Sequence, residues 1–396
     1  MGKRLIFITE ARFAKDQFGN IYGDPAFDLS LWERYLVCFD KVSVLARIEN
    51  ITDVVLLNGK ISIPPNKVFF LELPYYVGPL NYLRKRNSIK KAVKKIVKEN
   101  IDSKFICRVP GIVSDLVIKE LNIQNKKYAL EVVGDPDDVF APGVIKHPLR
   151  FYFRYQAVSS LKRNVKKASS VLYVTKEVLQ KKYPSEKNVF HTYASNVMLA
   201  DNLVSNQSLI WKKKSVYKIL CVGSLAQMYK SPDIVIKAIK YINKINADFK
   251  CELIWLGDGY FLEEMKQLVV DLKQENSITF LGSVSREIVL DFMKSVDLFV
   301  LASRTEGLPR VVVEAMGQGV PCVGTKVGGI PELLDENALV DKDDEFQLAL
   351  KIIEMLENES VYNFHSKRNL SESLNYVESV LVERRKSFYN YIISNL

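Results

Sequence analysis

One stretch of the sequence decides the fold: residues 298–327 read LFVLASRTEGLPRVVVEAMGQGVPCVGTKV. An apolar string at 298–301 is followed by a glycine-containing loop, a helical pattern over 310–317 and a second apolar string at 322–327. Strands buried on both faces have such continuous apolar composition, and their alternation with helices is typical of parallel, doubly wound sheets. The stretch therefore predicts an α/β fold.

The same alternation extends through the rest of the chain. In the second half it predicts strands at 217–222, 251–256 and 278–281, with helices at 232–246, 260–274 and 286–295. In the first half it predicts strands near 4–9, 41–46, 68–72, 105–109, 128–133 and 171–175. Because domains typically hold ~100–200 residues, the 396 residues predict two Rossmann-like domains.

The domain boundaries follow from weaker patterns. We expect an N-terminal domain at 1–199 and a C-terminal domain at 200–375, with the polar stretch 200–214 as linker. An amphipathic pattern over 376–396 predicts a closing helix that packs back toward the N-terminal domain.

Composition excludes several classes of protein. The chain is 48% hydrophobic and 26% charged, near the globular average, and it has no apolar run long enough to span a membrane. The first apolar run, 5–8, is too short for a signal peptide, and the five cysteines form no metal-binding or redox pair. We therefore expect a cytoplasmic protein without disulfides.

The loop at 305–309 and its two glutamates carry the densest chemical signal. Glu306 follows a strand, Pro309 suits the first turn of a helix, and Glu314 lies further along that helix. The loop should direct free backbone N–H groups and a positive helix end toward a ligand at the strand ends, and Glu314 should accept hydroxyl hydrogen bonds there. The alternative is an ordinary solvated helix start with a capping carboxylate.

A longer ordered pattern favours the ligand site. It comprises Val222-Gly223-Ser224, Lys230, Leu256-Gly257-Asp258-Gly259, Leu281-Gly282-Ser283-Val284, Glu306, Glu314-Ala315-Met316, Gly319-Val320-Pro321 and Gly328-Gly329-Ile330-Pro331-Glu332. This pattern resembles the signature of the retaining family 4 glycosyltransferases of the GT-B fold, among the glycosyl transferases group 1. The likeness is strong over about 217–335 and only general over the first domain. It implies two Rossmann-like doubly wound domains that face each other across a cleft, with 1–199 as the acceptor-binding domain and 200–375 as the nucleotide-sugar-binding domain.

The resemblance also implies roles for single residues. Glu306, with the backbone of Gly307 and Leu308, would hold the donor sugar, and Glu314 would hold the ribose. The remaining donor-binding positions would be Gly223, Ser224, Lys230, Gly257 and Val284. Lys230 would stabilise the departing phosphate without a metal or other cofactor.

One position departs from the family pattern. The family usually pairs the lysine with an arginine six residues earlier, where this chain has Ser224. Either another cation replaces it, with Arg304 and Arg310 nearest in the sequence, or the donor phosphates are held differently.

The first domain offers fewer candidates. Gly19 and Gly23 occupy the place of the family's glycine loop, and are weak candidates for the donor phosphate. Asp135 is the main candidate for a catalytic residue that faces the sugar, and Glu131 a weaker one. The spacing Asp135-x-Asp137 also matches the metal-binding motif of GT-A glycosyltransferases, an alternative that its position in the first half disfavours.

Basic residues concentrate in the first half. Residues 1–200 carry 33 Lys and Arg against 19 Asp and Glu, a net charge of +14, whereas 201–396 carry −4. At helical spacing, one predicted face gathers Lys90, Lys91, Lys94, Lys95 and Lys98, and the segment 146–155 combines basic and aromatic residues. Such surfaces bind anionic lipid headgroups, so the five lysines are candidates for a membrane or acceptor site; the alternative is an ordinary solvated helix face. No RNA-module signature is present, so nucleic acid is not expected.

The function predicted from these observations is retaining transfer of a sugar from a nucleoside diphosphate sugar to a lipid-linked or growing surface glycan. We expect it at the inner face of the cell membrane, to which the protein binds peripherally. Two alternatives stay open: a GT-B nucleotide-sugar epimerase, and a non-catalytic relative that docks on the membrane.

Overall fold

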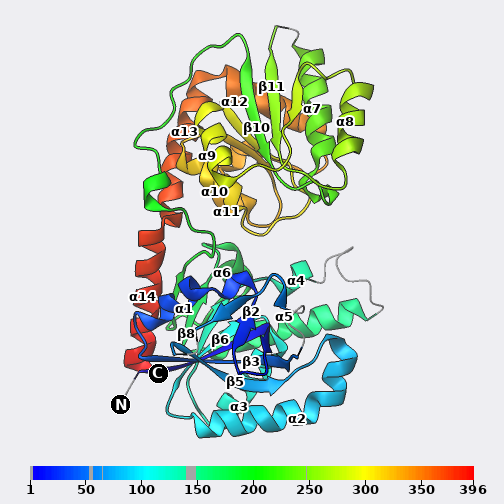
Figure 1. The fold of residues 1–396 in the computed structure, drawn as a ribbon. Helices are drawn as coiled ribbons and strands as arrows, with labels where there is room; N and C mark the ends of the chain where they lie inside the picture. Colours follow the sequence, from blue (N-terminus) through cyan, green and yellow to red (C-terminus); the bar gives the residue numbers. More distant parts are fainter. Residues whose placement is uncertain (1–2, 53–56, 65, 140–148, 247) are drawn as a thin grey trace. The chain divides into compact units, whose positions relative to one another are not determined.

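The computed structural model describes residues 3–52, 57–64, 66–139, 149–246 and 248–396. The chain forms two compact units, one of Met1–Ser195 with Val382–Leu396 and one of Asn196–Leu381 (Figure 1). Each unit is a sheet of mainly parallel strands covered by helices, which confirms the predicted α/β class. Among the described residues, no helix has the length and apolar content needed to cross a bilayer.

The first unit is built on a nine-stranded sheet. Its parallel strands are β1 (Arg4–Lys15), β3 (Lys41–Asn50), β5 (Val68–Pro74), β6 (Lys104–Val109), β7 (Ala129–Val132), β8 (Ser170–Tyr173) and β9 (Phe190–Tyr193). Two short strands, β2 (Ile21–Gly23) and β4 (Ile61–Ile63), extend it with antiparallel pairing. The helices are α1 (Leu29–Leu36), α2 (Gly78–Glu99), α3 (Ile112–Ile123), α4 (Pro136–Val139), α5 (Arg150–Lys167) and α6 (Val178–Lys182). All six strands expected in this half are present.

The second unit is a six-stranded parallel sheet in the order β12-β11-β10-β13-β14-β15. The strands are β10 (Tyr217–Val222), β11 (Cys251–Leu256), β12 (Ile278–Phe280), β13 (Leu298–Leu301), β14 (Cys322–Thr325) and β15 (Leu339–Val340). The helices are α7 (Pro232–Ile245), α8 (Leu262–Asp271), α9 (Arg286–Ser295), α10 (Arg310–Gly317), α11 (Ile330–Leu333), α12 (Glu345–Glu357) and α13 (Glu359–Ser373).

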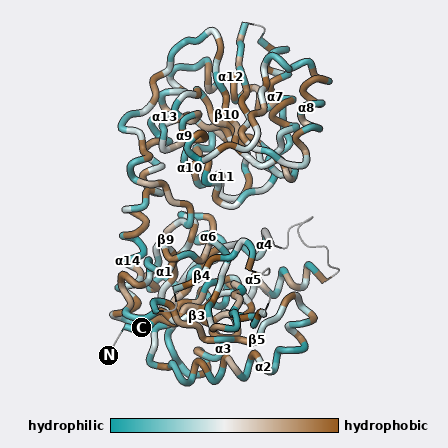
Figure 2. Tube along the Cα trace, in the orientation of Figure 1, coloured by the Kyte–Doolittle hydropathy of each residue, from teal (hydrophilic) through white to brown (hydrophobic). Residues whose placement is uncertain are grey.

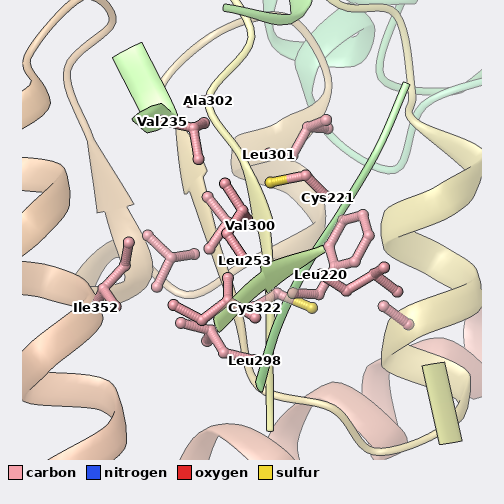
Figure 3. Packing of buried hydrophobic residues seen from close by; sticks show 14 of the residues in the cluster. Leu220, Cys221, Val235, Leu253, Leu298, Val300, Leu301, Ala302, Cys322 and Ile352 are labelled. Atoms are coloured by element: carbon pink, nitrogen blue, oxygen red, sulfur yellow. The ribbon is translucent and has the colours of Figure 1, made fainter. Parts of the chain in front are cut away.

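The core of the second unit explains why its strands are legible in the sequence. Leu298 and Val300 of β13 are fully buried, and Figure 3 shows them in one cluster with Leu220 and Cys221 of β10 and Leu253 of β11. The trace around β10 is correspondingly hydrophobic (Figure 2). Burying both faces of each strand removes the polar alternation of a solvated sheet.

The strand order also locates a binding edge, which here means the side of the sheet formed by the carboxyl ends of its strands. Successive strands run outward from β10 to β12, and the chain then returns to β13 on the other side of β10. Ligands of open α/β sheets bind at the carboxyl ends of the strands where the order reverses. The loops that follow β10 and β13 therefore flank the expected site.

The C-terminal helix α14 (Glu378–Asn395) belongs mostly to the first unit. The ring of Tyr389 lies 5.1 Å from that of Tyr35, and Tyr391 stacks on Phe190 at 4.6 Å. Arg385 is buried and donates a hydrogen bond to the carbonyl oxygen of Ser195. Buried aromatic and charged contacts thus fasten α14 to this unit.

The stretch 200–214, expected to be a linker, packs along the second unit instead. The N–H of Leu209 donates to Ser366 Oγ at 2.7 Å, and Trp211 Nε1 donates to the carbonyl oxygen of Leu356 at 2.6 Å. The chain changes unit earlier, between Ser195 and Asn196. The polar composition indicates a linker that makes few contacts, but the polar groups of this stretch form hydrogen bonds with residues of α12 and α13.

Candidate active site

An ion pair between Lys230 and Glu306 lies at the binding edge of the second unit. Lys230 ends a 3₁₀ turn, η4 (Met228–Lys230), which follows β10, and Glu306 lies in the loop between β13 and α10. Lys230 Nζ pairs with Glu306 Oε1, which also accepts a hydrogen bond from Ser303 Oγ at 2.8 Å. The two side chains are 12% and 11% exposed. A fixed cation and a fixed carboxylate are therefore present where strand order predicts a ligand.

Close backbone packing explains the glycines of the sequence pattern. A Cβ on Gly223 would lie 2.9 Å from Lys230 Cγ, so a side chain there would displace the lysine. Gly328 has φ +53°, and a Cβ on it would lie 1.8 Å from the carbonyl oxygen of Glu306. The adjacent N–H of Gly329 donates to the carbonyl oxygen of Gly307 at 2.8 Å. The Gly-Gly loop thus holds the backbone of the Glu306 loop.

The other predicted donor residues lie on neighbouring loops of the same edge. The N–H of Gly257 donates to the carbonyl oxygen of Gly282 at 2.8 Å and ties the loops after β11 and β12 together. Val284 and Leu308 are half-buried and pack against the core of the unit. Gly307 is exposed. The structure therefore gathers the predicted donor-binding set on one unit.

Glu314 is held by a residue that the sequence reasoning missed. Its side chain is only 4% exposed, and Arg286 donates to its Oε1 from both Nε, at 3.0 Å, and Nη2, at 2.8 Å. Arg286 is the first residue of α9. One signal in the sequence could have identified it. A cation at a helix N-terminus interacts unfavourably with the helix dipole, so its presence there indicates a stabilising partner outside the helix.

Of the two cations considered as substitutes for the missing arginine, Arg304 is already neutralised. Its guanidinium donates to Asp233 at 2.8 and 3.1 Å, to Asp343 at 2.5 Å and to the carbonyl oxygen of Met228 at 2.8 Å. The hydrogen bonds with Asp233 raise the pKa of Arg304 above its ordinary value. Arg304 thus braces the turn that carries Lys230, and its charge is not free for a phosphate.

Arg310 and Ser224 complete this edge. Arg310 is exposed at the start of α10, and no hydrogen bond or ion pair joins it to another residue in the described part of the chain. Ser224 Oγ donates to the carbonyl oxygen of Asp258 at 3.3 Å and accepts from the N–H of Ala226 at 3.2 Å. Ser224 therefore stabilises its own loop.

In the first unit, the carboxylate of Asp135 is occupied by neighbouring groups. Lys182 Nζ lies 2.5 Å from its Oδ2, and the Tyr183 hydroxyl donates to its Oδ1 at 2.6 Å. Lys182 also pairs with Asp137, and a hydrogen bond from Arg154 lowers the pKa of Asp137. Both carboxylates of the Asp135-x-Asp137 alternative are therefore already paired with cations of the chain. A sugar-facing role for Asp135 stays a prediction.

The three other residues proposed for the first unit lie in or beside its sheet, Glu131 on β7 and Gly19 and Gly23 in the β1–β2 hairpin. Glu131 is buried and accepts hydrogen bonds at 3.0 Å from the Tyr35 hydroxyl. Gly19 and Gly23 lie in the β1–β2 hairpin, not in a loop that leads from a strand into a helix. The hairpin forms because β1 continues past an irregularity between Ile8 and Arg12 as far as Lys15 and then pairs with β2.

The basic face on α2 forms as predicted by helical spacing. Ile89, Val93 and Val97 are buried, and the five lysines Lys90, Lys91, Lys94, Lys95 and Lys98 are exposed. At the start of the same helix, Leu80 and Leu83 are 74% and 60% exposed. On α5, the exposed aromatic residues are Phe151, Tyr152 and Tyr155. Residues 146–148 of the predicted basic and aromatic segment lie outside the described residues.

Comparison with known families and relatives bears on this site. The family model described as glycosyl transferases group 1 matches residues 216–358, which include Lys230, Glu306 and Glu314. Protein CapJ of Staphylococcus aureus is 29% identical, with 98% of this chain and 95% of CapJ covered. The similarity to CapJ therefore extends over both units.

A second relative and a solved structure extend the comparison. The UDP-Gal:alpha-D-GlcNAc-diphosphoundecaprenol alpha-1,3-galactosyltransferase of Escherichia coli is 26% identical, over 48% of this chain and 49% of that enzyme. The crystal structure of Anabaena Alr3699/HepE in complex with UDP matches 100% of both chains with a TM-score of 0.62 and 18% identity. At that identity the structural likeness shows the fold, which is the two-domain GT-B architecture.

Proposed function

Because this chain is a group 1 glycosyltransferase with the GT-B fold, we propose that it transfers a sugar from a nucleoside diphosphate sugar with retention of anomeric configuration. The observation that carries the proposal is the Lys230–Glu306 ion pair at the edge of the second sheet, with Glu314 on the adjacent helix. These residues match the family pattern in type and order, and the structure brings Lys230 and Glu306 into contact.

The proposed chemistry follows from the charges of this site. Breaking a glycosidic bond passes through an oxocarbenium-like transition state, and the departing nucleotide gains negative charge on its terminal phosphate. Lys230 supplies a fixed positive charge for that phosphate, and Glu306 can accept hydrogen bonds from sugar hydroxyls. The two groups satisfy each other before the donor binds, so neither is left unpaired in a partly buried site.

A second cation completes the phosphate site in this proposal. Arg310 is exposed and has no protein partner among the described residues, whereas Arg304 is paired with Asp233 and Asp343. We assign to Arg310 the part that the family gives to the arginine missing at Ser224. With Lys230 and Arg310 in place, the proposal requires no metal ion.

The names of the relatives support a choice of substrates. HepE was solved with UDP, and the Escherichia coli enzyme is named for a UDP-linked donor and a diphosphoundecaprenol acceptor. We therefore propose a UDP-sugar as the first donor to test and a lipid-linked glycan as the acceptor, in the synthesis of a surface polysaccharide. The exposed lysines of α2 and its apolar residues Leu80 and Leu83 support peripheral binding to the inner face of a membrane.

Nucleotide binding provides the first test. In a thermal-shift panel of UDP, GDP and ADP, we expect one nucleotide at about 100 times its Kd to stabilise the protein by about 2.7 kcal/mol. For a domain of about 150–250 residues this raises Tm by about 5–10 °C. Glu264→Ala, which removes an exposed glutamate from α8, should leave the shift unchanged. If none of the three nucleotides raises Tm, the proposed donor site is refuted.

Membrane binding provides a second test. Each lysine near an anionic surface contributes about 1 kcal/mol, so replacing Lys90, Lys91, Lys94 and Lys95 with glutamate should release the protein from phosphatidylserine-containing vesicles. Binding of the wild type should also weaken from 0.1 M to 1 M salt, as the Debye length falls from ~10 Å to ~3 Å. Cosedimentation measures both effects.

A matched variant shows whether vesicle binding depends on the α2 lysines or only on the net charge of the protein. Replacing four exposed lysines of the second unit with glutamate, Lys212, Lys213, Lys240 and Lys244, changes the net charge equally. This variant should still bind the vesicles. Equal loss of binding in both variants, or wild-type binding that salt does not weaken, would show that the α2 lysines are an ordinary solvated surface with no specific role in membrane binding.

A further inference from the structure

Glu314 is a charged residue in an otherwise apolar part of the core. Its neighbours on α10, Val312, Val313, Ala315 and Met316, are completely buried, and its own side chain is 4% exposed. A buried carboxylate without a partner is strongly unfavourable, so the fold must compensate for it. In the described part of the chain, that compensation comes from Arg286.

The contact with Arg286 is asymmetric. Both the Nε–H and an Nη2–H of the guanidinium donate to the same carboxylate oxygen, Oε1, at 3.0 and 2.8 Å. No residue of the described chain hydrogen-bonds to the other oxygen, Oε2. A carboxylate oxygen only accepts hydrogen bonds, so Oε2 is available for hydroxyl donors of a ligand.

The position of Arg286 is not explained by the helix that carries it. Arg286 is the first residue of α9, which Ser285 already caps by accepting from the N–H of Ile288. A cation in the first turn opposes the helix dipole, whereas the neighbouring Glu287 agrees with it. The guanidinium therefore bears an unfavourable interaction with its own helix while it fixes Glu314 on another.

We propose that Arg286 is a positioning residue that makes the site select ribonucleoside diphosphates over their deoxy forms. It holds Oε1 of Glu314 and leaves Oε2 directed to the ribose hydroxyls. This inference rests on the proposed function, in which Glu314 binds the ribose of the donor. A nucleotide without those hydroxyls would leave a buried acceptor unpaired, and sites built on such hydrogen bonds reject the analogue that lacks them.

The experiment compares two ligand pairs, UDP with 2′,3′-dideoxy-UDP and GDP with its dideoxy form, by isothermal titration calorimetry. We expect the wild type to prefer one ribonucleotide over its dideoxy form by about tenfold or more, the effect of a charge-assisted hydrogen bond. Arg286→Gln should reduce this preference to near unity and leave the dideoxy affinity unchanged. Arg286→Lys, which keeps a cation but loses the two-pronged contact, should restore part of the preference.

Two controls separate positioning from folding. Lys294→Gln removes a cation of an exposed ion pair from the same helix α9, and should keep the full preference. The Tm of each variant without nucleotide shows whether the fold is retained. Glu314→Gln combined with Arg286→Gln should be no worse than either change alone, because both changes remove the same interaction.

The outcomes discriminate between the proposals. An unchanged ribose preference in a folded Arg286→Gln variant overturns the inference but leaves the donor site standing. An equal loss of affinity for both members of a pair also overturns it, since Arg286 would then contact the phosphates or the base. If the wild type binds none of these nucleotides, the proposed function fails and the inference fails with it.

Discussion

Replacing Lys230 with alanine is expected to lower sugar transfer by about two orders of magnitude or more. Removing one preorganised group that stabilises transition-state charge typically has an effect of this size. Lys230 is held in place by its ion pair with Glu306, and Arg304 braces the preceding turn through the carbonyl oxygen of Met228. The charge is therefore fixed before the reaction begins. The measurement is the rate of nucleoside diphosphate release under saturating donor.

Two variants control this prediction. Lys240→Ala removes an exposed lysine from α7, the helix that follows Lys230, and should retain wild-type transfer. Ser224→Arg restores the arginine of the family pattern, and in the Arg310→Ala background it should recover transfer if Arg310 fills the missing position. Near-normal transfer by Lys230→Ala would show that the leaving phosphate is stabilised elsewhere.

Glu314→Ala and Glu306→Ala are expected to fail in different ways. The ribose contact of Glu314 persists through the reaction, so its loss should weaken UDP binding, whereas the sugar contact of Glu306 strengthens in the transition state, so its loss should lower kcat. Each change should cost roughly 1.5–3 kcal/mol, the range for hydrogen bonds to charged groups. Calorimetry of UDP binding and steady-state kinetics measure the two effects. Equal UDP affinity in wild type and Glu314→Ala would refute the ribose assignment.

The sequence predicts the second unit almost strand by strand. Three predicted strands have the bounds of β10, β11 and β13, and the helices at 286–295 and 310–317 have those of α9 and α10. The reason is burial: these strands are covered on both faces, so they form continuous apolar strings, and polar loops mark their ends.

The first unit is less predictable because pairing partners determine its edges. The strand β1 was expected to end near residue 9, but it extends to Lys15 and forms a hairpin with β2. The added part contains Arg12 and Lys15, whose polarity gives no strand signal. Its register is set by β3 and β2, which lie elsewhere in the sequence. Long-range pairing of this kind overrides local propensity.

In the candidate site, too, some features follow from the sequence and others do not. A motif marks Lys230 and Glu306, and strand order brings them together, so both their identity and their proximity follow from sequence reasoning. The partners of Arg304 and Glu314 do not, because no motif in the sequence marks Asp233, Asp343 or Arg286. Arg304 illustrates the consequence: proximity in sequence suggested a phosphate ligand, and the structure shows a cation neutralised by Asp233 and Asp343.

Acceptor-dependent release of nucleoside diphosphate tests the account most directly. The wild type would be incubated in EDTA with a UDP-sugar panel, with and without a lipid-linked glycan extract, and the released UDP would be measured. We expect UDP release that requires the extract, persists in EDTA and is lost in Lys230→Ala. Conversion of the donor without any acceptor, strict dependence on added Mn²⁺, or release that Lys230→Ala leaves intact would contradict it.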